Sequence, residues 1–468
     1  MEISDAFTFE VPGAKFQEKF KQRLWDGKIR LLNFKTRQIY AGLTRNIQEF
    51  AEQRDYTFEV VDPMAVDVSD EKADKFIEWL DLNPKIKIRP YQREAFLMAL
   101  REMRRLFISP TASGKSLMIY LVASYITKVL KRRVLIIVPS TQLVSQLYGD
   151  FVEYNRDSEE GLNVWQIRDG GEKRNDHEIT ITTWQAIQYQ PTAWYKPFTA
   201  MIGDEVHTFA AKALKTIAER CNAPIRLGFT GTLDGTETNE LVIQGLFGTV
   251  HQVTTYRELR EQGYIANPKI NCLVLDHDDV TRKAGVGLEY RDELKLLQSS
   301  IPRQQFLMKL ISHLEGNVLC LYQAIENHLI PMHELMVEQF GKEFVHKIHG
   351  SIKTDAREDI RRIFDSQKNA KLNASYQTCQ QGINIINIDH IVLCDPTKSQ
   401  IRLLQSMGRG LRRSETKTEV TIWDIADNLK WKRYKTNHTL NHMKERVKIY
   451  NREQFDYELI SRKLKVSQ

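Results

Sequence analysis

The sequence predicts an α/β protein of two tandem doubly wound parallel-sheet lobes, with a small N-terminal α+β domain and a C-terminal helical extension. Three observations predict this class. The 468 residues are too many for one hydrophobic core. Short apolar runs alternate with helical segments between residues 106 and 230, and the same alternation starts again near residue 318. Polar turns follow several of these runs, where doubly wound sheets hold their ligands.

We expect four parts in the chain. They are a basic α+β nucleic-acid-binding domain at 1–82, a nucleotide-binding lobe at 83–260, a second lobe at 261–430 and a basic helical extension at 431–468. In the first lobe the apolar runs predict strands at Val134–Val138, Ile179–Thr182, Ala200–Ile202 and Ile225–Phe229. In the second lobe they predict strands at Val318–Tyr322, Phe344–Ile348, Leu372–Tyr376, His390–Cys394 and Glu419–Trp423.

The two ends of the chain have weaker patterns. Near the start, Lys28–Leu32 and Gln38–Ala41 predict strands, a helix capped at Thr44 follows, and residues 66–84 are expected to be an acidic connection. Basic residues alternate there with aromatic ones, most of which we expect to be the core of this small domain: Phe16, Phe20, Trp25, Phe34 and Tyr40. In the tail, one apolar stripe predicts a docked amphipathic helix: Leu440, Met443, Val447 and Tyr450.

Charge is concentrated at the ends. The chain has 67 basic and 60 acidic residues, a net charge of +7, and residues 15–45 and 430–468 each carry +7 by themselves. This placement favours a polyanion held at the periphery. No apolar stretch of about 18 residues predicts a membrane span, and the start lacks a secretory signal. Five scattered cysteines without a CxxC pair are expected to be reduced core residues of a cytoplasmic protein.

The segment Ser109–Ser116 reads as a phosphate-binding loop. It follows the apolar run Leu106–Ile108 and opens a long apolar helix. Small residues at Thr111, Ala112, Ser113 and Gly114 would let backbone N–H groups face a phosphate at the positive end of that helix. Lys115 would reach the β- and γ-phosphates, and the Ser116 hydroxyl would ligate Mg²⁺.

Two further segments complete a nucleotide site. Upstream, Arg89, Tyr91 and Gln92 open a helix, and a glutamine beside an aromatic ring can hold adenine. Downstream, Asp204 and Glu205 follow an apolar run, so they are expected at the same sheet edge as the loop. There Asp204 can hold the Mg²⁺ that Ser116 also contacts, and Glu205 can polarise an attacking water.

The second lobe contributes arginines instead of a phosphate loop. Arg409 and Arg412 are three residues apart, so they share a helix face and could enter one cleft, and Gly408 between them indicates a close approach. An arginine supplied to a γ-phosphate across a domain interface accelerates hydrolysis by roughly 10³–10⁵.

In chain order these segments resemble the motifs of the superfamily 2 helicases. Tyr91-Gln92 is similar to the Q-motif, Pro110–Ser116 to the first motif, Pro139–Gln142 to the next, Asp204–His207 to a DExH box, Thr230–Thr232 to the coupling motif, Ala374–Asn384 to motif five and Gln405–Arg412 to motif six. The resemblance covers about residues 88–428 and implies two RecA-like lobes that use ATP and Mg²⁺. Asn384 replaces the usual Asp, so a ribose contact there would lose its charge.

The resemblance also implies a role for each motif residue. Catalysis would involve Lys115, Asp204, Glu205, His207, Gln405, Arg409 and Arg412. Besides the loop and adenine residues above, nucleotide contacts would come from Gly382 and Asn384, and Thr230, Gly231 and Thr232 would couple hydrolysis to the DNA side. A nucleic-acid strand would lie along Pro139, Thr141, Gln142, Gly170, Gly171, Thr183, Trp184 and Thr378. Such contacts position phosphates without reading sequence.

Outside the motor, Trp25–Leu32 and the tail from Asn437–Leu440 are similar to the phage UvsW helicases, which migrate branched DNA in recombination and at replication forks. This implies an ATP-dependent DNA helicase or translocase for branched DNA, a monomeric motor in the bacterial cytoplasm if phage-encoded. An RNA helicase with the same motor stays open, because no motif reads a 2′-hydroxyl. A non-catalytic binding protein with a relict nucleotide fold is disfavoured by the intact motifs.

The aromatic cluster Trp184, Trp194 and Tyr195 could wedge bases apart or pack in the core.

Overall fold

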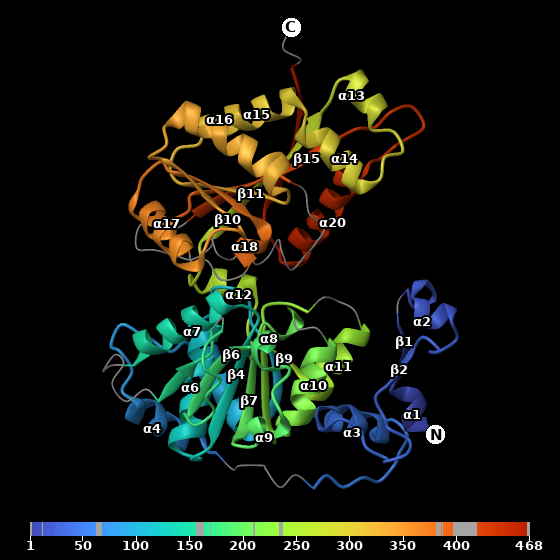
Figure 1. Ribbon diagram of the computed structural model, residues 1–468, viewed down its shortest axis with the longest axis vertical. Helices are drawn as coiled ribbons and strands as arrows, with labels where there is room; N and C mark the ends of the chain where they lie inside the picture. Colours follow the sequence, from blue (N-terminus) through green and yellow to red (C-terminus); the bar gives the residue numbers. More distant parts are fainter. Residues whose placement is uncertain are drawn as a thin grey trace. The chain divides into compact units, whose positions relative to one another are not determined.

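The computed structural model describes residues 2–11, 13–61, 68–155, 163–168, 170–208, 211–233, 237–380, 385, 387–395 and 419–465. It divides into two compact units. The first contains Met1–Ser109 and Gly114–Thr254, and the second contains Pro110–Ser113 and Thr255–Gln468. Within the described residues each unit is built on a seven-stranded sheet with helices on both faces (Figure 1). The predicted class, α/β with two doubly wound sheets in tandem, is therefore confirmed.

The sheet of the first unit has the order β5-β6-β4-β7-β8-β3-β9, and its described pairings are parallel. Its strands are β3 (Arg104–Ile108), β4 (Arg133–Val138), β5 (Val164–Gln166), β6 (Ile179–Thr183), β7 (Phe198–Asp204), β8 (Ile225–Thr230) and β9 (Val250–Gln252). Strands β4, β6 and β8 are buried along nearly their whole length, because helices cover both faces of a parallel sheet. The strands predicted in this lobe are confirmed.

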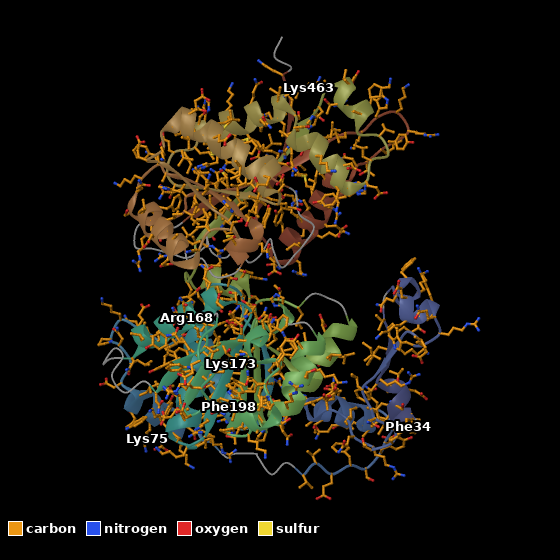
Figure 2. The ribbon with its side chains drawn as sticks, in the orientation of Figure 1. Phe34, Lys75, Arg168, Lys173, Phe198 and Lys463 are labelled. Atoms are coloured by element: carbon orange, nitrogen blue, oxygen red, sulfur yellow. The ribbon has the colours of Figure 1, made fainter. Side chains whose placement is uncertain are left out.

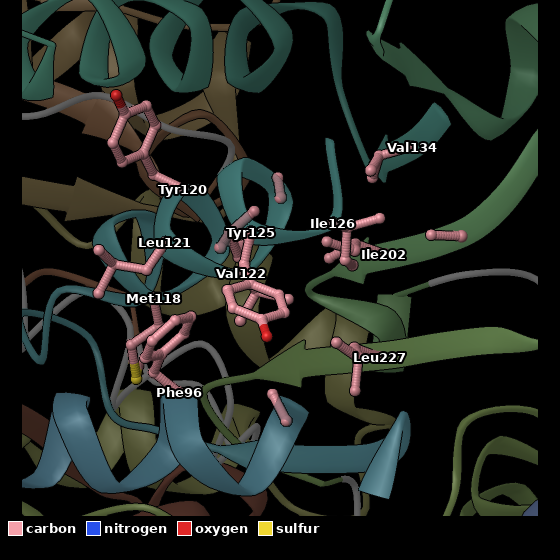
Figure 3. Close-up of a cluster of buried hydrophobic side chains, with 14 of the residues drawn as sticks. Phe96, Met118, Tyr120, Leu121, Val122, Tyr125, Ile126, Val134, Ile202 and Leu227 are labelled. Carbon is pink, nitrogen blue, oxygen red and sulfur yellow. The ribbon is translucent and has the colours of Figure 1, made fainter. Parts of the chain in front are cut away.

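Helices α5 (Pro90–Glu102), α6 (Lys115–Lys128) and α7 (Thr141–Tyr154) pack on one face of this sheet. Helices α8 (Trp184–Ile187), α9 (Thr192–Tyr195), α10 (Ala211–Cys221) and α11 (Glu237–Phe247) pack on the other. Helix α6 is buried from Leu117 to Thr127, as expected for a helix that is apolar all round. Figure 3 shows its side chains against Phe96 of α5 and against Val134, Ile202 and Leu227 of the sheet. This core fixes the helix that follows the phosphate loop.

The sheet of the second unit has the order β12-β13-β11-β14-β15-β10-β16, and its described pairings are also parallel. Its strands are β10 (Asn267–Asp276), β11 (Val318–Tyr322), β12 (Val345–Ile348), β13 (Lys371–Ser375), β14 (His390–Leu393), β15 (Glu419–Asn428) and β16 (Tyr457–Lys463). Its helices include α12 (Tyr256–Glu261), α13 (Asp279–Ala284), α14 (Tyr290–Gln298), α15 (Ile301–Ser312), α16 (Ile330–Phe340), α17 (Thr354–Ser366), α18 (Tyr376–Gln380) and α20 (His438–Arg452). The five predicted strands are confirmed, whereas β10 and β16 were not predicted.

The C-terminal segment is part of the second unit. Helix α20 buries Leu440, Met443 and Tyr450 of the predicted stripe, and its Arg446 pairs with Asp424 of β15 at 2.6 Å, both side chains almost fully buried. Beyond α20, β16 adds a strand beside β10 at the sheet edge. The prediction of a helix alone was incomplete. Among the described strands, β16 pairs with a neighbour on one side only, so most of its residues are polar and no apolar run predicts it.

The N-terminal segment contains α1 (Glu2–Ala6), α2 (Glu18–Lys21), α3 (Thr44–Glu52) and α4 (Asp70–Leu80), and β1 (Thr8–Glu10) pairs with β2 (Lys28–Arg30) in antiparallel fashion. Its small core is formed by Phe7, Leu31 and Leu43. A Cβ at Gly42 would clash with the carbonyl oxygen of Gln244, so this glycine lets the segment lie directly against α11. The N-terminal segment thus packs on the first lobe.

Three expectations for this segment were wrong. Gln38–Ala41 is not a strand, since only Gln38 bridges to Asn33 and a short 3₁₀ helix follows at Ala41–Leu43. Thr44 is the first residue of α3 and not its cap. Residues 70–80 of the predicted connection are α4, because Ser69 caps the helix and Phe76 faces the core while Asp70 and Asp74 pair with Arg93.

The N-terminal aromatic residues also differ from expectation. Phe16, Phe20 and Phe34 are exposed instead of forming the core, and Figure 2 shows Phe34 at the outer side of the segment. Elsewhere, the five cysteines form no disulfide bond and are all buried, as expected of core residues. Among the described helices, none is long and apolar enough to cross a bilayer.

Candidate nucleotide-binding and hydrolysis site

The phosphate loop is anchored at the carboxyl edge of the first sheet. It leaves β3 at Ser109, whose backbone N–H donates to the carbonyl oxygen of Thr230 at the end of β8, 2.8 Å away. Ala112 and Gly114 have φ values of 70° and 80°, and this left-handed conformation turns the chain sharply before α6 begins at Lys115. The N-cap residue of α6 is Gly114, which has no side chain to cap the helix. Its first backbone N–H groups therefore suit an anion.

The predicted adenine residues lie against this loop. The carboxamide oxygen of Gln92 accepts from the backbone N–H of Arg89 at 2.9 Å, and the Arg89 guanidinium donates to the Tyr91 hydroxyl at 2.7 Å. A Cβ at Gly114 would clash with Nε2 of Gln92, so the amide of that buried glutamine faces the loop itself. The structure therefore brings Arg89, Tyr91 and Gln92 together with the loop.

The carboxylate of Glu205 joins the loop to the end of β8. Its Oε1 lies 2.5 Å from Nζ of Lys115, and its Oε2 accepts from the backbone N–H of Gly231 at 3.1 Å. His207 Nδ1 lies 2.5 Å from the hydroxyl of Thr230 and 3.5 Å from Oε2 of Glu205. The Thr230 hydroxyl also donates to the carbonyl oxygen of Thr232 at 2.8 Å. The sequence-predicted loop, DExH and coupling residues thus form one hydrogen-bonded network.

The two adjacent carboxyl groups differ in their electrostatics. Burial and the charge of Glu205 raise the pKa of Asp204 to about 7. Burial also acts to raise the pKa of Glu205, but the charges of Lys115 and His207 and the hydrogen bonds to Lys115 and Gly231 outweigh it and lower that pKa to about 2. Glu205 is therefore held as a carboxylate, whereas the negative charge of Asp204 is poorly compensated.

Tyr154 is a site residue that sequence reasoning missed. Its hydroxyl lies 2.7 Å from the hydroxyl of Ser116, at the start of α6. Tyr154 is the last residue of α7, and no motif connects it to the loop 38 residues earlier. Only the packing of α7 against α6, where Tyr154 and Phe151 contact Tyr120, brings the two hydroxyl groups together.

The predicted strand-contact residues of the first lobe follow the carboxyl ends of β4 and β6. Pro139, Thr141 and Gln142 come after β4, Thr183 caps α8 at the end of β6, and Trp184 is partly buried against the core. Gly170 and Gly171 form a turn, and in the second unit the Thr378 hydroxyl lies 2.6 Å from that of Ser375. Tyr195 is fully buried and bonds to the carbonyl oxygen of Ile187, which contradicts a wedging role for it.

Five predicted site residues lie outside the described residues: Gly382, Asn384, Gln405, Arg409 and Arg412. The described part of the chain has no group of three or more His, Cys, Asp or Glu side chains that could hold a metal ion. The candidate ligands Ser116 and Asp204 therefore offer one hydroxyl and one carboxylate.

A phosphate loop and paired acids at one edge of a doubly wound sheet, followed by a second such sheet, define a nucleoside-triphosphate-driven motor of the helicase class. Comparisons with known proteins agree. Residues 85–235 match the family described as "Type III restriction enzyme, res subunit", residues 302–414 match "Helicase conserved C-terminal domain", and residues 1–62 match "DNA helicase UvsW, N-terminal".

The chain belongs to the UvsW family of superfamily 2 helicases. It is 30% identical over 97% of its length to the ATP-dependent DNA helicase uvsW of Enterobacteria phage T4, 94% of which is covered. It is 28% identical to the DNA 3'-5' translocase XPB2 of Sulfurisphaera tokodaii, over 47% of each chain. A structure of the ATP-dependent restriction-modification enzyme LlaBIII bound to DNA shares the fold with a TM-score of 0.57 and 16% identity, over 82% of this chain and 31% of that one.

Proposed function

We propose that this protein is an ATP-dependent DNA helicase or translocase that acts on branched DNA, in branch migration or fork regression. The observation that carries the proposal is the network of Lys115, Glu205, Gly231, His207 and Thr230. This network connects the phosphate-binding loop to residues 230–232, which follow β8. The phage T4 relative is named as an ATP-dependent DNA helicase, which supports DNA as the nucleic acid.

In the proposed mechanism, Lys115 changes partner when ATP binds. In the structure its ammonium group lies beside Glu205. The β- and γ-phosphates carry more negative charge than one carboxylate, so they attract Lys115 and leave the Glu205 carboxylate to polarise the attacking water. The same carboxylate accepts from the N–H of Gly231, so its movement is passed to residues 230–232.

Mg²⁺ fits the oxygen atoms beside the loop. Ser116 and Asp204 would hold the ion, since hydroxyl and carboxylate oxygens suit Mg²⁺, which keeps several waters and needs few protein ligands. The negative charge of Asp204 is poorly compensated by the described protein groups, so a cation fits there. When bound, Mg²⁺ neutralises charge on the phosphate oxygens. Tyr154 would orient the Ser116 hydroxyl toward it.

Other residues of the chain bind and position the two substrates. Arg89, Tyr91 and Gln92 hold adenine beside Thr111, Ala112, Ser113 and Gly114. A DNA strand lies along Pro139, Thr141, Gln142, Gly170, Gly171, Thr183 and Trp184 of the first lobe and Thr378 of the second. Gly382, Asn384, Gln405, Arg409 and Arg412 stay predictions from the family motifs. The four-part division at 82, 260 and 430 is likewise proposed.

ATP hydrolysis by the full chain tests the proposal. The rate is measured alone and with a four-way junction, single-stranded DNA, unbranched duplex or RNA. We expect DNA to stimulate hydrolysis and the junction to be migrated. A larger stimulation by RNA would make the protein an RNA helicase, and hydrolysis no faster than for Lys115→Ala would make it a relict nucleotide fold.

A further inference from the structure

Two hollows lie between the N-terminal segment and the first lobe. One, of about 660 Å³, is lined by α3 and by residues 101–105, 224, 248 and 249. The other, of about 730 Å³, is lined by residues 30–33 and 38–41 together with α10, Arg104 and Arg226. Both include Ala41 and Arg104, so the two hollows adjoin, and we call them together the rear groove. Both hollows lie within the first compact unit.

The rear groove is remote from the nucleotide site. Arg104 is the first residue of β3, and the phosphate loop leaves the other end of that strand at Ser109. The four steps from Arg104 to Ile108 span roughly 13 Å at the usual rise of a strand. Pro224 and Thr249 likewise come directly before β8 and β9. The groove therefore runs along the amino edge of the sheet, opposite the edge that carries the motor residues.

Basic side chains outnumber acidic ones in the lining of the rear groove. Its first hollow is lined by Arg45, Arg101, Arg104 and Arg105 with Glu102 as its one acidic side chain. Its second hollow adds three basic side chains and one acidic one: Arg30, Lys215, Arg226 and Glu219. Seven basic residues and two acidic ones line the groove, and Asp26, Glu49 and Asp70 pair with three of its arginines from outside the lining. A concave surface with such an excess concentrates positive potential.

Three of these cations are available to a ligand. Arg30, Arg45 and Lys215 have side chains that are 50%, 59% and 51% exposed. Each is paired with one exposed carboxylate of its own segment, Asp26, Glu49 and Glu219 respectively. Exposed ion pairs of this kind contribute little to stability, so a phosphate can replace the carboxylate. Arg105 and Arg226 are buried and form the floor.

The chemistry of the groove fits a backbone and not unstacked bases. Among the described residues that line it, Tyr40 is the one aromatic side chain, and its ring packs against Gly245. Single-stranded nucleic acid is held in part by exposed rings on which bases stack, whereas sequence-independent binding of duplex DNA depends on contacts to its phosphates. We propose that the rear groove binds the phosphate backbone of duplex DNA, as a second contact separate from the motor channel. The proposal rests on the proposed function, because it takes DNA as the substrate.

A charge-removing variant tests the rear groove. Arg30→Gln, Arg45→Gln and Lys215→Gln are combined in the full chain. The matched control combines Arg257→Gln, Lys295→Gln and Arg362→Gln, which remove the same charge from similarly exposed ion pairs outside the groove. Affinities for a 30-base-pair DNA duplex and a 30-nucleotide single strand are measured by fluorescence anisotropy between 50 and 200 mM salt. Both lengths are chosen to extend across the whole rear groove.

We expect the ratio of duplex to single-strand affinity to fall at least about tenfold in the groove variant, and the salt slope of duplex binding to become shallower by about 3, since each phosphate contact contributes about 0.9. An unchanged ratio and slope relative to the control would overturn the proposal. ATP hydrolysis by the unaltered protein is followed in parallel, because its absence would refute the proposed function without bearing on the groove.

Discussion

Nζ of Lys115 lies 2.5 Å from Oε1 of Glu205, although 90 residues separate them in the chain. The pair is largely buried, with side chains 12% and 16% exposed. In this pair the carboxylate of Glu205, which would polarise the attacking water, is bound to Lys115, which would bind phosphate. Displacement of this one ion pair by ATP would therefore release the carboxylate for hydrolysis.

Glu205→Gln should abolish ATP hydrolysis and leave ATP binding intact. The amide cannot polarise water as a carboxylate does, and the loss of such a base typically lowers the rate by about 10²–10⁴. The measurement combines single-turnover hydrolysis with the affinity for a fluorescent ATP analogue. Glu178→Gln is the control, because Glu178 makes an exposed ion pair with Lys128 near the far end of α6. Hydrolysis at the unaltered rate would exclude Glu205 from catalysis.

Gly114→Ala should prevent ATP binding. The new Cβ would clash with Nε2 of Gln92, and the φ of 80° is strained for alanine. Both the loop and the proposed adenine pocket would move, so we expect nucleotide affinity to fall beyond detection in a fluorescence titration. Gly149→Ala in α7 is the control, since nothing lies within 4 Å of its added Cβ. Equal affinities of the two variants would contradict the placement of Gln92 against the loop.

Asp424→Asn should strongly destabilise the second unit. It leaves the buried guanidinium of Arg446 without its counter-charge and weakens the hydrogen bond from the Tyr450 hydroxyl. Breaking a buried pair typically costs about 3–5 kcal/mol. Urea unfolding measures the loss, with Asp292→Asn in an exposed ion pair as the control. A loss no larger than that of the control would show that the C-terminal helix is not held through Arg446.

The contribution of Asp395 to stability should depend on pH. Burial acts to raise its pKa, but the charge of His328, their hydrogen bond and the charge of Arg303 lower the pKa to about 2. A lowered folded-state pKa gives stability that is present above about pH 4, the unfolded value, and is lost as the pH falls toward 2. The difference in unfolding free energy between the unaltered chain and Asp395→Asn should therefore shrink by about 2 kcal/mol across this window. A difference that is constant from pH 6 to pH 2.5 would be inconsistent with this lowered pKa.

The sequence predicted the strands that are buried on both faces. Val134–Val138 is a run of apolar, mostly β-branched residues, and it forms most of β4. Strand β16 was missed because it lies at a sheet edge with exposed polar side chains, so its sequence has no apolar run. Helix α4 was missed because its acidic residues resemble a linker, although Asp70 also pairs with Arg101 of α5. These errors concern elements whose partners are distant in the chain.

In the candidate site, too, some contacts could be predicted from the sequence and others depend on packing between distant elements. The order of the motifs indicated that Lys115, Glu205 and Thr230 would meet, since parallel strands end at one sheet edge. The contact of Tyr154 with Ser116 could not be predicted, because it depends on how two helices pack. The rear groove likewise could not be predicted, since it forms where the N-terminal segment lies on the lobe.

Branch migration by Lys115→Ala is the most direct test that ATP hydrolysis at this site drives movement of DNA. The conversion of a labelled four-way junction is followed with ATP for the unaltered protein, for Lys115→Ala and for Lys128→Ala, which changes another lysine of α6. We predict that only Lys115→Ala loses both ATP hydrolysis and junction conversion while still binding the junction. Junction conversion by Lys115→Ala at the unaltered rate would contradict a motor driven from this site.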